Sequence, residues 1–154
     1  MENKRINYGK RFEEDFIKSI PTHCFTYRFK DGGGWSNATN LRFTSSNICD
    51  FLLFNGEYLY LLELKSVKGK SFSFNNIGNH LDEMCKASKF YNIKAYYIIN
   101  FREENKTFMI DSNILKQLTL KDKKSCNIKD LEELCCELIP QELKRTRWKY
   151  DFIE

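Results

Sequence analysis

The sequence predicts an α/β protein in which a mixed central β-sheet is flanked by helices. Three observations predict this fold class. Short aromatic and aliphatic runs, typical of strands, alternate with segments of helical periodicity. The two strongest strand segments are joined by Asn55-Gly56-Glu57, which is a hairpin turn signature. The length of 154 residues suits one domain over residues 1–154, and no repeat or linker divides it.

The composition excludes several classes of protein. With 42% hydrophobic and 30% charged residues, and only 7 Gly and 2 Pro, the chain is neither disordered nor collagen-like. No apolar run approaches the roughly 18 residues of a membrane span, and the polar N-terminus is unlike a signal peptide. We therefore expect a cytoplasmic protein with no membrane partner. Six cysteines without CxxC spacing are expected to be buried free thiols. The net charge of +4 permits a polyanionic partner without requiring one.

The first third of the chain is predicted to contain a helix, a strand and a long polar segment. Residues 9–20 form the expected helix, because large apolar residues recur at four-residue steps before Pro21. Residues 24–29 are rich in aromatic residues and Thr, which is typical of a strand. Residues 31–47 contain three consecutive glycines and few large apolar residues. A loop of this length in a compact domain is usually functional or mobile.

The rest of the chain is predicted to be built around one hairpin. Residues 48–54 and 58–66 are its two strands. After it, the patterns predict a helix, a buried strand with a shorter partner, two short helices, and a basic, aromatic tail. These cover residues 77–91, 94–101, 107–110, 113–118, 128–138 and 141–154.

Three ionisable residues lie in this hairpin, where a pure core strand would have none. Asp50 lies in its first strand, and Glu63 and Lys65 lie in its second. Residues two apart in a strand share a face, so Glu63 and Lys65 point the same way. One two-residue loop, Asn55-Gly56, places Asp50 opposite Leu61, and the loop one residue further along places it opposite Glu63. A three-residue loop without a bulge would instead put Asp50 on the other face.

Two carboxylates at neighbouring cross-strand positions, with backbones roughly 5 to 8 Å apart, can reach one divalent cation. Without a cation, two acids on a largely buried face would repel each other and lose hydration. Mg²⁺ takes oxygen ligands and bridges to phosphate, and the ammonium of Lys65 can orient a water and offset transition-state charge. The pattern therefore indicates phosphodiester hydrolysis. The plain alternative is a solvated or salt-bridged face of an edge hairpin.

The motif resembles a known family. Asp50, followed thirteen residues later by Glu63-Leu64-Lys65, is similar to the D, spacer, (D/E)-x-K core of the PD-(D/E)xK nuclease superfamily. The segments ICDFLLF, ELKSVKGKSFSFNNI, NHLDEM and AYYIINF, in this order, resemble the RecU-type Holliday junction resolvases. The resemblance covers about residues 9–108 and implies a restriction-endonuclease-like core. Two departures are Cys49 in place of Pro, and His80-Leu81 in place of His-Gln.

The resemblance implies a role for each hairpin residue. Asp50 and Glu63 would be catalytic acids and ligands of Mg²⁺, with Mn²⁺ as the other candidate. The backbone carbonyl of Leu64 would be a third ligand, and Lys65 would be the catalytic lysine.

The resemblance also implies a catalytic acid from the first helix. Glu13, in the motif GKRFE, would lie near the metal or its water, and Glu14 could take its place. The alternative for Glu13 is an interaction with the helix dipole alone.

Basic and polar residues around the hairpin are candidates for phosphate contacts, since Lys and Arg neutralise phosphates and hydroxyl groups position them. The candidate DNA-binding residues are Arg28, Arg42, Ser66, Lys68, Lys70 and His80. The resemblance implies that residues 31–47 project into the junction, with Trp35 and Phe43 as wedges or stacking residues. The basic tail KRTRWKY, residues 144–150, either binds nucleic acid or docks on the body of the protein.

The sequence thus predicts a Mg²⁺-dependent endonuclease that cleaves Holliday junctions or other branched DNA in recombination or repair. Because a four-way junction has two-fold symmetry, this substrate implies a homodimer. One alternative is a restriction-type or repair nuclease on linear or damaged DNA. The other is a catalytically inactive DNA-binding protein on the same scaffold.

Overall fold

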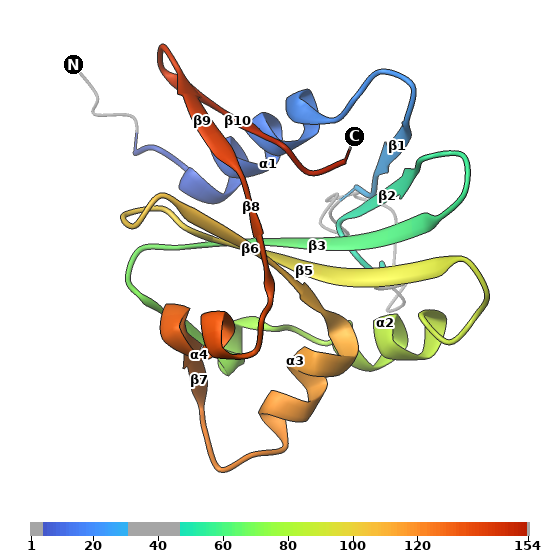
Figure 1. The fold of residues 1–154 in the computed structure, drawn as a ribbon, viewed down its shortest axis with the longest axis vertical. Helices are drawn as coiled ribbons and strands as arrows, with labels where there is room; N and C mark the ends of the chain where they lie inside the picture. The colour runs from blue at the N-terminus through green and yellow to red at the C-terminus, as the bar shows by residue number, and fades with distance from the viewer. Residues whose placement is uncertain (1–4, 31–46, 154) are drawn as a thin grey trace, which may run out of the picture.

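The computed structural model describes residues 5–30 and 47–153 (Figure 1). Its helices are α1 (Tyr8–Ser19), the 3-10 helix η1 (Phe74–Asn76), α2 (Leu81–Ala87), α3 (Ser112–Thr119) and α4 (Ile128–Glu133). Its strands are β1 (Phe25–Arg28), β2 (Phe51–Phe54), β3 (Leu59–Val67), β4 (Ser71–Ser73), β5 (Ile93–Phe101), β6 (Lys106–Asp111), β7 (Ser125–Asn127), β8 (Glu137–Ile139), β9 (Gln141–Lys144) and β10 (Arg147–Tyr150). Of the predicted segments, residues 31–46 lie outside the described ranges, together with Arg42, Trp35 and Phe43.

Six strands form one mixed sheet in the order β1-β2-β3-β5-β6-β8. β3 and β5 are parallel, and the other neighbouring pairs are antiparallel. The chain crosses from β3 to β5 through β4, η1 and α2, because parallel strands cannot be joined by a tight turn. The predicted mixed sheet flanked by helices is confirmed.

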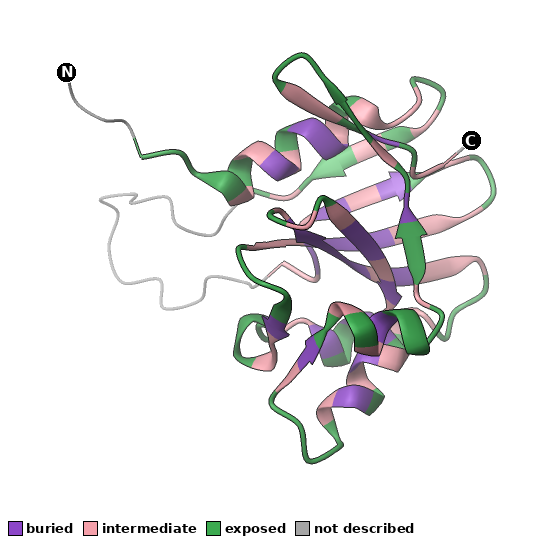
Figure 2. Cartoon of the chain, turned by 60° about the vertical axis from the view of Figure 1, so that its left-hand side comes forward, coloured by how far each residue is buried: buried purple, intermediate pink, exposed green. Residues whose placement is uncertain are grey.

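The sheet separates two hydrophobic cores. On one face, α2, α3 and α4 pack against the sheet, with Tyr97 and Met84 fully buried between them. On the other face, α1 and the β9–β10 hairpin cover Leu62, Phe16 and Tyr150 (Figure 1). Figure 2 shows that the buried residues concentrate in the middle strands and on the inner sides of the helices. Any side chain on a central strand is therefore assigned to one core or the other by its parity along the strand.

The predicted helix over residues 128–138 is wrong in its second half. α4 ends at Glu133, and Cys135 adopts a φ of +53°, a left-handed conformation that ends a helix. Residues 137–139 instead form β8, which pairs antiparallel with β6. Ile139 is thereby buried in the core beneath α1. Sheet pairing outweighs the local helical pattern in this segment.

The predicted helix over residues 77–91 is also too long. α2 covers only Leu81–Ala87, because Gly78 has a φ of +79° and interrupts the chain between η1 and α2. At its other end, Asn92 has a φ of +60° and turns the chain into β5. No helix in the described ranges is long and apolar enough to cross a membrane. All six cysteines are free thiols, as predicted, but only Cys49 and Cys126 are buried; Cys135 is exposed, and Cys24, Cys85 and Cys136 are half-buried.

The basic C-terminal tail is a β-hairpin docked on α1. Asp15 of α1 is buried, and its carboxylate accepts hydrogen bonds from the Arg147 guanidinium and from the backbone N–H of Trp148 at 3.2 Å. The backbone N–H of Tyr150 donates to the Ser19 hydroxyl at 2.9 Å. Of the two predicted roles for this tail, docking on the body is the one that the structure shows.

Replacing Asp15 by Ala is expected to lower the free energy of unfolding by about 2 to 3 kcal/mol, because a guanidinium and a backbone N–H lose their buried acceptor. Chemical denaturation followed by circular dichroism measures this loss. The matched control is Glu14→Ala, which removes the exposed partner of the same Arg147 and should leave stability nearly unchanged. Equal losses in both variants would show that the docking does not depend on Asp15.

Candidate active site

The register of the β2–β3 hairpin places the two predicted acids opposite each other. Phe51 pairs with Leu62, and Phe54 pairs with Leu59; Asp50 directly precedes this ladder, and extending the same register by one residue sets it against Glu63. The loop is therefore the second of the two predicted possibilities, with Gly56 at its tip in the left-handed region at a φ of +99°. The backbone of Asp50 is held on both sides, since its N–H donates to Leu62 at 3.1 Å and its carbonyl accepts from Phe29 at 2.9 Å.

The Asp50 carboxylate lies where the β2 ladder ends. Its Oδ2 accepts a hydrogen bond from the backbone N–H of Leu64 at 2.9 Å, in the place where a further strand residue would have accepted it. In a strand, the N–H and C=O of one residue point to the same side. The Leu64 carbonyl therefore points toward the side of β3 on which Asp50 lies. A main-chain oxygen and a carboxylate are thus adjacent at one end of the hairpin.

Glu63 is a buried carboxylate with one oxygen paired and one unpaired. Glu63 is only 2% exposed. Its Oε1 lies 2.8 Å from the Nζ of Lys65, whereas its Oε2 has no hydrogen-bond partner among the described residues. Burial raises the pKa of Glu63, the negative charge of Asp50 raises it further, and Lys65 and His80 lower it. The net effect is a raised pKa, which means that the surroundings of Glu63 destabilise its charged form.

The residues that pack beside the acids are buried. Tyr97, which pairs with Glu63 across β3 and β5, is fully buried and donates its hydroxyl to the Ile77 carbonyl at 3.1 Å. Burial, followed by the negative charges of Glu63 and Asp50, raises the pKa of Tyr97. Cys49, which stands in place of the expected Pro, donates its thiol to the Phe51 carbonyl at 3.1 Å. Burial raises the pKa of this thiol to about 12, so it is not a thiolate ligand at neutral pH.

The donor atoms fit a hard divalent cation. Asp50, Glu63 and the Leu64 carbonyl offer only oxygen, and the unpartnered Glu63 Oε2 lacks the hydrogen bond that a buried carboxylate oxygen requires. Within residues 5–30 and 47–153, no three His, Cys, Asp or Glu side chains lie close enough together to hold a metal. Asp50 and Glu63 are therefore the two candidate side-chain ligands, and the Leu64 carbonyl is the adjacent candidate for a third.

The two acids predicted from the first helix have different surroundings. Glu13 accepts from Arg28 at 3.0 Å, next to the end of β1, and Arg28 also lies over the Phe51 ring. Glu14 pairs with Arg147 at 2.9 Å, and this hydrogen bond lowers the pKa of Glu14. Glu14 of α1 thus contacts the docked C-terminal hairpin. Because α1 covers the sheet face opposite Glu63 and Lys65, a role of Glu13 at the metal stays a prediction.

The predicted DNA-binding residues do not form one cluster. Lys68 and Lys70 are exposed in the turn after β3, and Lys70 lies 3.8 Å from Glu104. His80 directly precedes α2, on the side of the acids. Ser66 lies apart from them, because strand alternation turns its side chain to the opposite face from Lys65, where it donates to Asn100, and its contact with DNA stays a prediction. Arg42 lies outside the described residues.

Sequence reasoning missed Tyr97 and the contact between Asp50 and the Leu64 N–H. Tyr97 falls within a continuous apolar run, in which one position looks like the next. Its place under Glu63 depends on the parallel register of β3 and β5, which the crossover decides. The Leu64 contact depends on where β2 ends, and strand ends are weakly marked in sequence.

A mixed sheet of this order, with two acids and a lysine on the β2–β3 hairpin, defines the PD-(D/E)xK class of fold. The family model of RecU, recombination protein U, matches residues 3–147, and the chain belongs to this family. It is 30% identical over 159 residues to the SPbeta prophage-derived uncharacterized protein YotM of Bacillus subtilis (strain 168), covering 95% of this chain and 81% of that protein.

A solved structure has a similar fold. Hjc of the archaeal hyperthermophile Archaeoglobus fulgidus, a Holliday junction resolvase, matches with a TM-score of 0.53 and 15% sequence identity. The match covers 81% of this chain and 93% of that chain. At this identity the likeness concerns the fold alone, and it supports the predicted restriction-endonuclease-like core.

Glu63→Gln is expected to raise the midpoint of thermal unfolding at pH 7 in the presence of EDTA, because it removes a buried charge with an unpartnered oxygen. Since the folded state raises the pKa of Glu63, the folded protein takes up this proton before the unfolded chain does as the pH falls. The advantage of the variant should therefore shrink as the pH falls toward 4.5, the ordinary pKa of this group.

Thermal melts at a series of pH values, all in EDTA, measure this difference. Glu133→Gln, which removes an exposed carboxylate at the end of α4, serves as the control and should show no such pH-dependent gain. An advantage of Glu63→Gln that grew toward acidic pH would contradict the assigned burial of the charge.

Proposed function

We propose that this protein is a metal-dependent endonuclease that cleaves phosphodiester bonds in Holliday junctions or other branched DNA. The observation that carries the proposal is the buried Glu63 carboxylate next to Asp50. One of its oxygens has no partner among the described residues, and the other lies 2.8 Å from the Lys65 ammonium. A buried acid without a full set of partners costs stability, and metal-assisted hydrolysis gives such an arrangement a use. Membership of the RecU family and the fold shared with the resolvase Hjc favour branched DNA as the substrate class.

The proposed cofactor is Mg²⁺, with Mn²⁺ as the second candidate, because both take oxygen ligands. Asp50, Glu63 and the Leu64 carbonyl would hold it. When bound, the ion would offset phosphate charge and make a water molecule easier to deprotonate. The hydrogen bond from Leu64 to Asp50 fixes one carboxylate, and the surrounding core fixes the other, so the site is ordered before the substrate arrives.

Lys65 is the proposed catalytic lysine. Its side chain is 28% exposed, so its ammonium lies at the boundary between the buried Glu63 and solvent. From there it can donate a hydrogen bond to the attacking water or to a phosphate oxygen. Either contact stabilises negative charge that develops in the transition state. Glu13 would add an acid from the α1 side, positioned by Arg28.

The proposed partners are branched DNA and a second copy of the chain. The described candidates for phosphate contacts are Lys68 and Lys70 in the turn after β3, His80 before α2, and Arg28 at the end of β1. Homodimerisation is proposed from symmetry, since resolving a junction requires two equivalent cuts. Residues 31–47 remain the predicted projection into the junction.

Lys65→Ala is expected to reduce cleavage of a synthetic four-way junction in Mg²⁺ by about 100-fold or more, because it removes charge stabilisation from the transition state. Asp50→Asn should abolish cleavage, while both variants should still bind the junction in EDTA. Gel assays of cleavage and of binding measure the two effects. The control is Lys86→Ala on the exposed side of α2, which should cut as the wild type does.

The same assay separates the alternatives. Preferential cutting of a linear duplex would favour a restriction-type or repair nuclease. Junction binding unchanged by Asp50→Asn, with no Mg²⁺-dependent cutting by the wild type, would favour an inactive DNA-binding protein. Equal cutting by wild type and Lys65→Ala would remove the lysine from the mechanism.

A further inference from the structure

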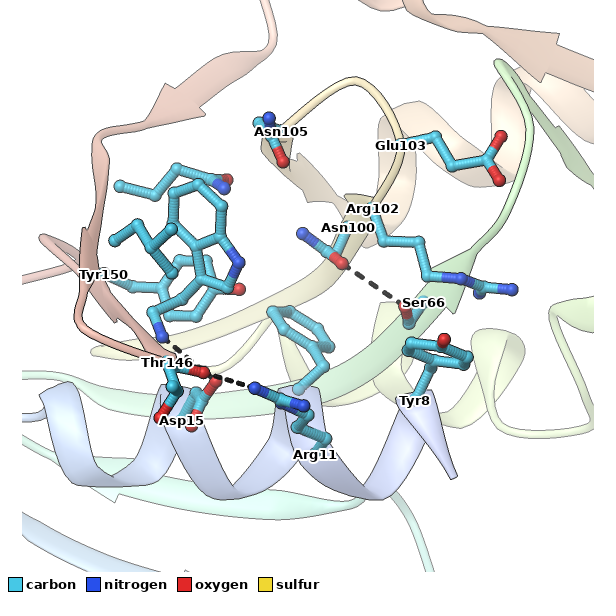
Figure 3. A pocket seen from close by; sticks show the side chains of 14 residues that line it. Tyr8, Arg11, Asp15, Ser66, Asn100, Arg102, Glu103, Asn105, Thr146 and Tyr150 are labelled. Carbon is cyan, nitrogen blue, oxygen red and sulfur yellow. Dashed lines mark hydrogen bonds between the residues drawn. The ribbon is translucent and has the colours of Figure 1, made fainter. Parts of the chain in front are cut away.

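A cavity of about 280 Å³ lies on the sheet face opposite the two acids. It is enclosed by the first turns of α1, the ends of β3 and β5 with the turn that follows, and the β9–β10 hairpin (Figure 3). Its volume is close to the lower end of the range of about 300 to 1,000 Å³ that is usual for small-molecule sites. The cavity therefore suits a single small ring system.

The floor of the cavity is a chain of side-chain hydrogen bonds with one direction. The Ser66 hydroxyl donates to Asn100, the Asn100 amide donates to Thr107 at 2.9 Å, and the Thr107 hydroxyl donates to the Gln141 carbonyl oxygen at 2.7 Å. Asn100 is only 5% exposed. Because Gln141 is used here as an acceptor, its NH₂ group is left as a donor, and the Ser66 oxygen keeps lone pairs as an acceptor. The floor thus offers both donors and acceptors.

The walls of the cavity are aromatic, and its charged lining consists of Arg11, Arg102, Glu103 and Asp15, of which Asp15 is paired with Arg147. Tyr8 and Trp148 supply accessible ring surface, and the buried rings of Phe12 and Tyr150, which pack edge-on against each other, lie behind them. At the rim, the Arg102 guanidinium lies over the Tyr8 ring, 4.7 Å from its centroid. Arg11 also lines the cavity and donates to the Thr146 carbonyl (Figure 3). Flat apolar walls, a hydrogen-bonding floor and two guanidinium groups match the three parts of a nucleotide: the faces of its base, the edge of its base and its phosphate.

We propose that this cavity binds one unpaired nucleotide, with the base against the accessible rings of Tyr8 and Trp148 and the phosphate at Arg11 and Arg102. The nucleotide could be free or part of a DNA strand. The position of the cavity favours the strand, because Ser66 on its floor directly follows the proposed catalytic Lys65. This last step rests on the proposed function.

The test measures binding in EDTA, so it does not depend on cleavage. Trp148 fluorescence is followed in a Trp35→Phe background, which leaves Trp148 as the single tryptophan. Three probes are titrated: dAMP, a single-stranded oligonucleotide, and an oligonucleotide of the same length made of abasic sites. The base-carrying oligonucleotide is expected to change the fluorescence saturably and to bind at least tenfold more tightly than the abasic one.

Two variants at the rim test the assignment. Tyr8→Ala should remove most of the preference for the base-carrying probe, and Arg102→Ala should weaken binding of both oligonucleotides about five- to tenfold. Both residues lie at the surface end of the cavity, and an unchanged melting temperature verifies folding. The matched controls are Tyr58→Ala and Lys94→Ala, since these form the same kind of cation–π pair, at 3.9 Å, outside the cavity. Neither control should alter binding.

The outcomes separate this proposal from the nuclease assignment. Tight binding of dAMP, lost in Tyr8→Ala, would support the site with a free nucleotide as its source, and binding of the oligonucleotide alone would support a DNA strand. Equal affinity for the base-carrying and abasic probes would overturn the proposal, even if the protein cleaves junctions. Failure of the wild type to cleave in Mg²⁺ would instead remove the nuclease assignment and leave the binding result intact.

Discussion

The structure depends most on the register of one antiparallel hairpin. Asn55 closes its turn by accepting hydrogen bonds at its side-chain oxygen from the backbone N–H groups of Glu57 and Tyr58, at 3.0 and 2.8 Å. Gly56 supplies the left-handed conformation that the turn needs. A slip of one residue would move Asp50 to the face of α1 and away from Glu63. The local chemistry of the turn therefore decides whether two acids can share an ion.

The site also depends on the termination of β2. If β2 had continued along β3, a backbone carbonyl would have accepted the Leu64 N–H, and the Asp50 carboxylate would have had no fixed position. Because the ladder stops, the Asp50 side-chain oxygen accepts the Leu64 N–H in place of a backbone carbonyl. The price is a buried Glu63 with an unpartnered oxygen, and the tightly packed residues around it keep the arrangement in place.

Alternate residues of β3 point to opposite faces of the sheet, and this separates the proposed catalytic residues from the cavity. Glu63 and Lys65 face the side of α2, whereas Ser66 faces the cavity between α1 and the C-terminal hairpin. The buried Asp15 holds that hairpin on α1 by accepting a hydrogen bond from the Trp148 N–H. This contact places Trp148 in the wall of the cavity. The proposed catalytic site and the proposed nucleotide site therefore use neighbouring residues of β3 and lie on opposite faces of the sheet.

The sequence by itself determined the hairpin, the shared face of Glu63 and Lys65, and the mixed sheet flanked by helices, because these features follow from periodicity and turn chemistry over short distances. It did not determine the end of α4, the strand β8 or the docking of the tail, since burial of Ile139 and Asp15 by distant segments outweighs local preference. The pairing of Glu14 with Arg147 was equally beyond it, because Arg147 lies far along the chain, and the choice between Glu13 and Glu14 as the helix acid stays a prediction. Tertiary structure alone placed Tyr97 beside Glu63 and formed the cavity between α1 and the β9–β10 hairpin, because both require strands and helices remote in sequence to meet.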